Sequence, residues 1–356
     1  MLYSGARILI EALVEQGVDT VFGYPGGVML FIYDELYKNS DRIKHILVNH
    51  EQQAAHAADG YARSTGKTGV CIATSGPGAT NLVTGIATAY MDSSPLVAIT
   101  GNVATNLLGK DSFQEVDITG ITMPVVKHNW IVKDTADLAE VVREAFIVAN
   151  SGRPGPVLID IPKDVTSDTA EWRPLSKAAV GDAGSSGCSK RLAARASRKT
   201  FGEADIEQAV GMIAASKYPF IYAGGGVIAS DAGSELNVLA ERIKAPVALT
   251  LMALGALDSG HPLCTGMIGM HGTVASNKAA QKADLLITVG ARFSDRVTSR
   301  ADVFAQNAKI LQFDIDPAEV NKNIQTDFAI TGNIKAILQK LLEKLPRRDP
   351  NASGWH

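Results

Sequence analysis

The sequence predicts an α/β protein made of two doubly wound domains, each with a mostly parallel sheet covered by helices. A length of 356 residues is typical of about two domains, and 46% hydrophobic residues are enough for two cores. Short β-like runs alternate with helical patterns in both halves, as in repeated βαβ units. The small, polar and basic stretch Lys177–Thr200 separates the halves. It reads as a solvated linker, although its charge would also suit an anion-binding patch.

In the first half, apolar runs and amphipathic stretches define the expected elements. The predicted strands lie near Thr20–Phe22, Ile43–Val48, Gly69–Ala73, Leu96–Thr100 and Val157–Ile161. The predicted helices cover Ser4–Glu15, Val28–Tyr37, Glu51–Thr65, Ala79–Met91 and Ala136–Ala149. Parallel strands all end at one edge of a sheet, so the segments that follow them are expected to line one ligand crevice.

The second half repeats this alternation. Strands are predicted at Phe220–Tyr222, Val247–Thr250, Leu285–Val289 and Ile310–Asp314. Helices are predicted at Glu203–Ala215, Ser234–Ile243, Val274–Lys282 and Ile334–Lys344. The second half is therefore expected to fold around a sheet of its own.

Glu51 is the first candidate for chemistry. It opens an alanine-rich helix directly after the apolar run Ile46–Val48, which would deliver its carboxyl group to the ligand edge of the sheet. The alanines of this helix leave room for a neighbour or a flat ligand to approach closely. An acid that is simply favoured by the positive end of a helix is the alternative interpretation.

Three turns of the first half are rich in Gly and Pro: Gly23–Gly27, Ser75–Gly78 and Gly152–Pro156. The first two follow predicted strands and precede predicted helices, so their backbone amides could line the ligand crevice. Tight strand-to-helix connections also require such residues for structural reasons alone.

The strand ends of the second half suit a nucleotide. The turn Gly224–Gly226 offers open backbone for phosphates, Arg292 offers a cation, and Asp314 and Asp316 offer carboxylates for a ribose or a base. The G-x-G-x-x-G fingerprint is absent, because Gly226 is followed by Val227-Ile228-Ala229.

Composition and spacing argue against several other functions. A net charge of −3 without a basic stripe makes nucleic acid an unexpected partner. The N-terminus is an amphipathic helix, and no long apolar run occurs, so we expect a cytoplasmic protein without a membrane segment. Cys71, Cys188 and Cys264 are far apart and the histidines lack ligand spacing, so neither disulfides nor a metal site is expected.

Nine motifs carry a resemblance to a known family. They are FGYPGG, NHEQQAAHAADGYAR, TSGPGATN, DSFQEVDITGIT, RPGPVLIDIPKDV, AGGGV, GMHGT, GARFSDRV and DIDPAEV. Together they resemble the large subunit of acetolactate synthase, a thiamine-diphosphate enzyme, from Met1 to about Leu345. The helix that begins at Glu51 marks the wider thiamine-diphosphate superfamily, whereas the combination with FQE, IPKDV and GARFSDRV is more specific.

The resemblance implies a task for Glu51. A carboxyl group that hydrogen-bonds N1′ of the cofactor's aminopyrimidine lets that ring remove the C2 proton, and it works best in an apolar niche. The carbanion would attack pyruvate, lose CO2 and pass a hydroxyethyl group to a second 2-oxo acid. Residues implied in the wall around the aminopyrimidine are Gly26, Gly27, Pro77, Gly78 and Asn81. Phe113, Gln114 and Lys163 are implied on the substrate side, where Lys163 would neutralise a carboxylate or simply be a solvated lysine.

The resemblance also implies FAD in the middle domain, as a structural flavin that is not oxidised or reduced during carboligation. The implied flavin contacts are Gly225, Gly226, Leu251, Met252, His271, Arg292, Asp314 and Asp316. His271 alone would equally suit an ordinary turn. The implied domains are a pyrimidine-binding domain at 1–170, a linker at 171–200, a Rossmann-like FAD-binding domain at 201–345 and a tail at 346–356.

The sequence also departs from the family. Family members hold Mg2+ and the diphosphate with a GDG motif in a third domain, whereas Gly181-Asp182-Ala183 lacks the second glycine. We therefore expect a truncated or split large subunit that is inactive alone, with Mg2+ held through the missing domain. The resemblance further implies a homodimer or higher oligomer and a possible regulatory small subunit.

Three hypotheses follow. The first is acetolactate synthase itself, in branched-chain amino acid biosynthesis, with the third domain supplied elsewhere. The second is another thiamine-diphosphate-dependent 2-oxo acid decarboxylase or carboligase. The third is a non-catalytic remnant that binds flavin or partner subunits. The FQE and GARFSDRV matches favour the first hypothesis over the second.

Overall fold

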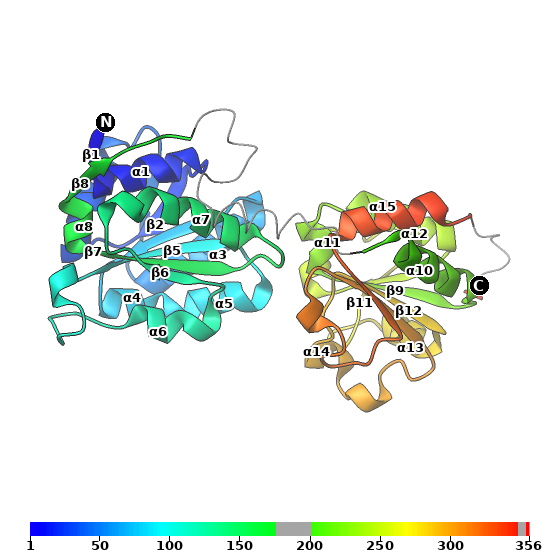
Figure 1. The fold of residues 1–356 in the computed structure, drawn as a ribbon. Coiled ribbons are helices and arrows are strands. Elements are labelled where there is room, and N and C mark those ends of the chain that lie inside the picture. The colour runs from blue at the N-terminus through cyan, green and yellow to red at the C-terminus, as the bar shows by residue number, and fades with distance from the viewer. Residues whose placement is uncertain (176–200, 348–353, 356) are drawn as a thin grey trace. The chain divides into compact units, whose positions relative to one another are not determined.

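The computed structural model describes residues 1–175, 201–347 and 354–355, and the chain divides into two compact units, Met1–Arg198 and Lys199–His356. Each unit is a six-stranded parallel sheet between two layers of helices (Figure 1). The predicted fold class, α/β with two mostly parallel sheets, is confirmed. No helix among the described residues is long and apolar enough to cross a membrane.

The sheet of the first unit has the strand order β3-β2-β4-β5-β7-β6, and all its neighbouring strands are parallel. Its strands are β2 (Thr20–Gly23), β3 (Lys44–Leu47), β4 (Gly69–Ala73), β5 (Leu96–Asn102), β6 (Asn129–Ile131) and β7 (Pro156–Pro162). The chain goes from β2 to β3 on one side and then returns to β4 on the other, so the strand order reverses at β2 and β4. Ligands of open α/β sheets bind at such a reversal.

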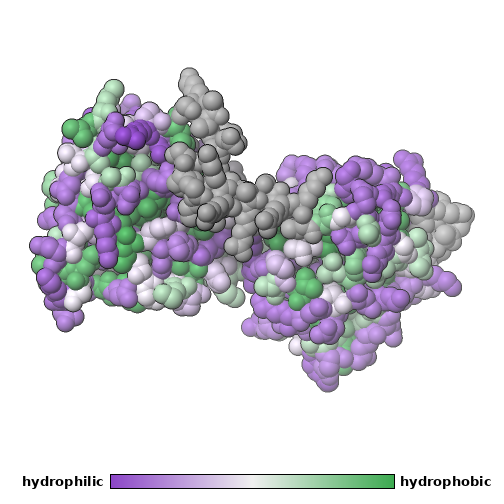
Figure 2. Space-filling model, in the orientation of Figure 1, coloured by the Kyte–Doolittle hydropathy of each residue, from purple (hydrophilic) through white to green (hydrophobic). Residues whose placement is uncertain are grey.

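Helices cover both faces of this sheet (Figure 1). One face packs against α1 (Gly5–Glu15), α2 (Leu30–Lys38) and α7 (Leu138–Asn150). The other packs against α3 (Glu51–Thr65), α4 (Pro77–Asn81), α5 (Val83–Asp92) and α6 (Ile118–Thr122). Strands β4, β5 and β7 are buried along their whole length, which explains their continuous apolar sequences. Polar residues predominate on the visible surface of both units, with apolar residues scattered among them (Figure 2).

Some predicted boundaries shift at helix starts. The helix expected at Val28–Tyr37 begins with the 3-10 turn η1 (Gly27–Met29) before α2. The helix expected at Ala79–Met91 begins earlier, because a proline is well suited to the first turn, and is divided into α4 and α5 at Leu82. A 3-10 turn, η4 (Thr135–Asp137), likewise precedes α7. The three-residue edge strand β6 is too short to give a clear sequence pattern and was not predicted.

The first unit extends beyond the predicted boundary at residue 170. Strands β1 (Leu2–Ser4) and β8 (Thr169–Glu171) form a small antiparallel sheet. After it, the Trp172 N–H donates to Met1 O at 2.8 Å, and the Leu175 N–H donates to a Glu15 carboxylate oxygen at 2.6 Å. The prediction that a linker begins at residue 171 is therefore wrong, because 171–175 belong to this unit. The rest of the predicted linker lies outside the described residues.

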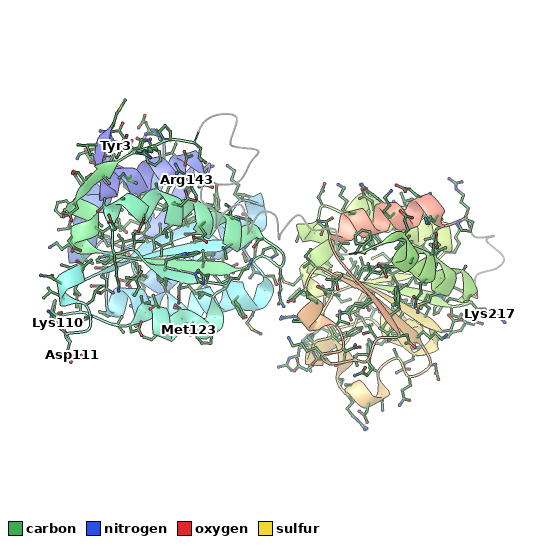
Figure 3. All side chains as sticks on the ribbon, viewed as in Figure 1. Tyr3, Lys110, Asp111, Met123, Arg143 and Lys217 are labelled. Carbon is green, nitrogen blue, oxygen red and sulfur yellow. The ribbon has the colours of Figure 1, made fainter. Side chains whose placement is uncertain are left out.

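Arg143 of α7 strengthens this connection. Its guanidinium pairs with Glu15 at 2.7 Å and also donates to Arg173 O at 2.8 Å, and its side chain is only 8% exposed (Figure 3). Bidentate geometry and additional backbone bonding satisfy this nearly buried charge. The segment 172–175 is thus held by a specific polar contact as well as by its backbone.

The sheet of the second unit has the order β11-β10-β9-β12-β13-β14, again parallel throughout. Its strands are β9 (Pro219–Ala223), β10 (Val247–Leu249), β11 (Cys264–Met267), β12 (Leu285–Val289), β13 (Lys309–Asp314) and β14 (Phe328–Thr331). This order is that of a dinucleotide-binding Rossmann sheet, with the reversal between β9 and β12. The outer strands β11 and β14 were not predicted, because they are only half-buried and their sequences are less apolar.

The two faces of this sheet are again covered differently. One packs against α10 (Glu203–Ala215), α11 (Gly225–Ala229), α12 (Gly233–Ile243) and α15 (Ile334–Lys344). The other packs against α13 (Val274–Lys282) and the segment 291–305, which includes α14 (Asp295–Thr298).

The end of the predicted tail, 346–356, is part of this packing. The Trp355 ring lies 5.5 Å from Tyr218, and its indole N–H donates to Pro219 O at 2.8 Å. Lys282 lies over the Tyr218 ring at 4.7 Å, a cation–π contact. Trp355 is therefore docked on the second unit, while 348–353 and 356 of the predicted tail lie outside the described residues.

Candidate active site

The carboxyl edge of the first sheet gathers all the residues predicted for thiamine diphosphate and its substrate. Gly26 and Gly27 follow β2, Glu51 follows β3, and the turn before α4 follows β4. The loop 103–117 follows β5, and Lys163 begins α8 (Lys163–Ser167) directly after β7. The parallel sheet therefore explains how segments far apart in sequence converge.

Glu51 lies at this edge with a buried carboxylate. It is 9% exposed, and Asn81 Nδ2 donates to its Oε2 at 2.9 Å. The helix itself is capped by another residue, because His50 Nδ1 accepts the Gln52 N–H at 3.2 Å. Burying a carboxylate is costly, and a residue that served only the helix end would not need to be buried. The burial of Glu51 against α4 therefore favours the chemical interpretation over the helix-end interpretation.

The glycines around Glu51 leave space for specific side chains. A Cβ at Gly26 would lie 2.4 Å from Thr74 Cβ, and one at Gly78 would lie 2.6 Å from Thr74 Cγ2 and 3.2 Å from Glu51 Oε1. Gly26 and Gly78 are therefore required by their neighbours. A Cβ at Gly27 would meet nothing within 4 Å, so Gly27 is not required for packing.

Polar atoms near Glu51 fit a polar ligand. Among the described residues, Tyr33 Oη, Thr74 Oγ1 and Ser75 Oγ are buried without a hydrogen-bond partner. Burial raises the pKa of Tyr33, and the nearby Cys71 and Glu51 raise it further. Buried hydroxyls without partners are costly in a protein alone, so this polar environment agrees with a site for a heteroaromatic ring. Sequence reasoning did not single out Tyr33, which lies within a predicted helix, or Thr74, which directly precedes the turn Ser75–Gly78, because their burial beside Glu51 depends on the tertiary fold.

The substrate-side candidates lie on the loop 103–117 and at α8. Phe113 is 88% exposed, and Gln114 and Lys163 are also exposed. Asp111 and Gln114 have φ angles of 52° and 57°, which are unfavourable for residues other than glycine.

Glu115 stabilises this unusual loop. Its carboxylate accepts the N–H groups of Gly109, Lys110 and Ser112, the last at 2.9 Å. These backbone donors lower the pKa of Glu115. Sequence reasoning did not single out Glu115, because its partners are formed only by the turn of the loop.

The carboxyl edge of the second sheet gathers the eight residues predicted for FAD. Gly225 and Gly226 follow β9, Leu251 and Met252 follow β10, His271 follows β11, Arg292 follows β12, and Asp314 and Asp316 lie at the end of β13. Leu251 is 70% exposed, Met252 and His271 are exposed, and Arg292 is half-buried. This edge therefore combines exposed apolar side chains with charged groups, as a site for a flat nucleotide ligand would need.

The glycines after β9 serve packing as well. Gly226 N–H donates to Gly290 O at 2.9 Å, and a Cβ at Gly226 would lie 2.7 Å from Gly290 Cα. The expectation that the whole turn Gly224–Gly226 offers open backbone is therefore wrong, because the Gly226 amide is already bonded. Close approach of β9 and β12 at the reversal of strand order accounts for Gly224 and Gly226, whereas a Cβ at Gly225 would lie 3.1 Å from Met252 Cβ.

We expect Gly226→Ala to lower the free energy of unfolding by about 1–3 kcal/mol, since a methyl group would be forced against backbone. Gly211 is the matched control, because a Cβ there meets nothing within 4 Å. It lies inside α10, so Gly211→Ala should raise stability by roughly 0.5–1 kcal/mol. Urea unfolding of both variants checks the pair, and equal stabilities would contradict the packing argument.

The acidic side chains after β13 are also engaged locally. Asp314, which is 7% exposed, accepts the Asp316 N–H at 2.9 Å. Asp316 in turn accepts the Ala318 N–H at 3.0 Å at the start of η7 (Pro317–Glu319). These bonds fix the turn in which both carboxylates are presented.

A separate cavity of about 340 Å³ lies at the opposite edge of the first sheet, among residues that include Thr20, Tyr61 and Phe146. Asp19 beside it is bonded to Tyr61 and Lys67, so the polar groups there are paired with each other. We place the candidate active site at Glu51, because the carboxyl edge has the converging polar groups.

Comparisons with known proteins agree with this architecture. Residues 3–121 match the family model "Thiamine pyrophosphate enzyme, N-terminal TPP binding domain", and residues 206–341 match "Thiamine pyrophosphate enzyme, central domain". The chain belongs to the thiamine pyrophosphate enzymes, of which it carries these two domains.

Within that family, the chain is a homologue of acetolactate synthase large subunits over nearly its whole length. It is 49% identical to the "Acetolactate synthase large subunit" of Parasynechococcus marenigrum, covering 99% of this chain and 56% of the relative. It is 50% identical to the "Acetolactate synthase" of Arthrospira platensis, with coverages of 96% and 58%. For the "Probable acetolactate synthase large subunit" of Methanocaldococcus jannaschii the identity is 51%, with coverages of 96% and 56%. The chain thus spans somewhat more than half the length of these relatives.

Proposed function

We propose that this chain provides the aminopyrimidine-binding part of an acetolactate synthase active site. The observation that carries the proposal is the Glu51 carboxylate, which is buried at the reversal of strand order and held by Asn81 at 2.9 Å. When bound, thiamine diphosphate supplies a C2 carbanion that adds to the carbonyl group of a 2-oxo acid. The residues of this chain bind and orient that cofactor.

In this proposal Glu51 acts through one oxygen. Asn81 donates to Oε2, and Oε1, beside Gly78, is the oxygen that would hold a proton toward the aminopyrimidine. A side chain at residue 78 would crowd that oxygen. The buried position keeps bulk water from competing for the proton. Gly26, Gly27 and Pro77 complete the wall around the ring.

The substrates and partners belong to the same proposal. Pyruvate is the donor and a second 2-oxo acid the acceptor, with Phe113, Gln114 and Lys163 facing them. Lys163 is exposed and can pair with a substrate carboxylate. Mg2+ and the diphosphate are held by a further domain, in a cytoplasmic homodimer or higher oligomer with a possible regulatory small subunit. The pathway is the synthesis of branched-chain amino acids, including valine and isoleucine.

The domain division is part of the proposal as well. The first domain is the pyrimidine-binding domain predicted at 1–170, extended to 175 by the contacts of Trp172 and Leu175. The second, predicted at 201–345, is an FAD-binding domain that uses the eight residues of the second carboxyl edge.

A chimera tests the activity. The chain replaces the matching segment of the Corynebacterium glutamicum "Acetolactate synthase large subunit", to which it is 50% identical. Acetolactate formation from pyruvate is the expected result. Decarboxylation with a different product would favour another thiamine-diphosphate carboligase or decarboxylase. A folded chimera that binds thiamine diphosphate without turnover would favour a non-catalytic remnant.

Flavin binding gives a separate prediction. FAD titrated into the full chain should bind with quenched fluorescence, and Arg292→Ala should weaken binding about tenfold, the typical loss for a charge-assisted contact. Arg300, an exposed arginine of the same unit that pairs with Asp302, is the control, and Arg300→Ala should bind as the parent does. Unchanged flavin spectra with folded parent chain would refute the flavin proposal.

A further inference from the structure

We propose that Asp164 is a positioning residue that holds the loop 103–117, called here the substrate loop, against α8. The importance of this role rests on the proposed function, in which Phe113 and Gln114 of this loop face the substrate. Asp164 follows Lys163, the third substrate-side candidate, so one contact would align both parts of the substrate side.

The anchor is a single carboxylate that binds several donors. Thr105 N–H donates to both oxygens of Asp164 at 3.0 Å, and Thr105 Oγ1 donates to Oδ2. Asp164 also accepts its neighbour's amide, Val165 N–H, at 3.1 Å. Thr105 lies 59 residues away in sequence, at the start of η2 (Thr105–Leu107), so this carboxylate joins two separate segments.

A second carboxylate stiffens the tip of the substrate loop. Glu115 gathers the amides of Gly109, Lys110 and Ser112, which closes the chain around the exposed Lys110 and Asp111 (Figure 3). A shift at Thr105 would therefore be passed through this turn to Phe113, because the backbone between them is hydrogen-bonded to one side chain.

The far end of the substrate loop touches the cofactor side of the site. A Cβ at Gly76 would lie 2.6 Å from Gln114 O, and Gly76 itself has a φ of 58°. Gly76 immediately precedes α4, which carries Gly78 and Asn81 beside Glu51. The substrate loop thus extends from Asp164 at one end to the turn beside Glu51 at the other.

A plain structural role makes a different prediction. If Asp164 only supported the start of α8, its loss would lower thermal stability and leave the substrate loop unchanged. If Asp164 positions the loop, amide protection and substrate affinity must change together, while C2-proton exchange of the cofactor, which depends on Glu51, must not.

The first measurement uses the full chain without cofactor or substrate. Hydrogen exchange of the peptide 103–117 is followed by mass spectrometry in Asp164→Asn and in Thr105→Val. Exchange should speed up by roughly ten- to hundred-fold in Asp164→Asn, because bonds to a charged acceptor are strong, and by less in Thr105→Val, which keeps its N–H. If Asp164→Asn does not fold, Thr105→Val still tests the same contact.

Asp134 provides the matched control. It accepts the Ala136 N–H at 2.9 Å at the start of η4 and lies outside the substrate loop. Asp134→Asn should leave the exchange of 103–117 unchanged. If Asp164→Asn and Thr105→Val both fold but the exchange of this peptide is unchanged, the proposal that Asp164 holds the substrate loop is wrong.

The second measurement uses the chimera. Asp164→Asn should raise KM for pyruvate and lower kcat/KM by about ten- to hundred-fold, as expected for a misplaced binding group. C2-proton exchange should stay within about twofold of the parent, since general acid–base catalysis is untouched. Faster loop exchange with unchanged KM would overturn the positioning role. If the parent chimera makes no acetolactate although the loop responds, the proposed function fails, and the substrate role of the loop with it.

Discussion

Replacing Glu51 by glutamine in the chimera should slow C2-proton exchange of bound thiamine diphosphate by about a hundred- to ten-thousand-fold, the usual value of a positioned acid–base group. Glutamine keeps the size of the side chain and an oxygen that can accept from Asn81 Nδ2, as Glu51 does at 2.9 Å in the parent. It has no acidic proton to share with N1′. NMR of the C2 proton under quenched-flow exchange measures the effect directly.

Glu140 is the control for a merely electrostatic role. It lies in the first turn of α7, as Glu51 does in α3, but on the other face of the sheet, where its carboxylate lies 3.7 Å from the Arg143 guanidinium. Glu140→Gln should cost at most about 1 kcal/mol of stability and leave exchange unchanged. Should Glu51→Gln exchange the C2 proton at the parental rate, Glu51 is structural and the central assignment fails.

Asp160 should make the first unit less stable as the pH rises from about 4 to 6. Its side chain is 1% exposed and accepts Thr100 Oγ1 and Asn102 Nδ2, both at 2.6 Å. Burial raises its pKa from 3.8 to about 6, although the two hydrogen bonds lower it. The charge of Asp117 adds a smaller increase. The folded chain therefore keeps a proton that the unfolded chain loses between pH 3.8 and 6. The resulting loss of stability is nearly complete by about pH 7 and amounts to roughly 3 kcal/mol.

Asp160→Asn should remove this pH dependence, because the amide stays neutral and can still bond both neighbours. Denaturant unfolding at a series of pH values should show the parent losing about 2 kcal/mol relative to the variant between pH 4 and 6.5. Asp19 provides a contrast, since its bonds to Lys67 and Tyr61 lower its pKa to about 2. Asp19→Asn should change the profile only below pH 4, where the parent protonates Asp19. If the free energy of unfolding depends on pH in the same way in the parent and in Asp160→Asn, the raised pKa of Asp160 is wrong.

The sequence by itself determined the fold class and the positions of the strong elements. The core strands β4 and β12 have the predicted bounds, because their fully buried apolar runs leave no other interpretation. The same holds for α3, α10 and α15, whose apolar and small residues recur with helical spacing. The placement of Glu51 at the ligand edge also followed from sequence, since parallel strands present their carboxyl ends together.

Tertiary structure alone decided what surrounds these residues. Asn81 bonding Glu51, Thr74 filling the space between Gly26 and Gly78, and Asp164 binding Thr105 join segments that no local pattern relates. The half-buried edge strands β6, β11 and β14 likewise depend on their neighbours for pairing. The physical reason is that periodicity and turn chemistry act over a few residues, whereas these contacts depend on the strand order that brings distant segments to one edge.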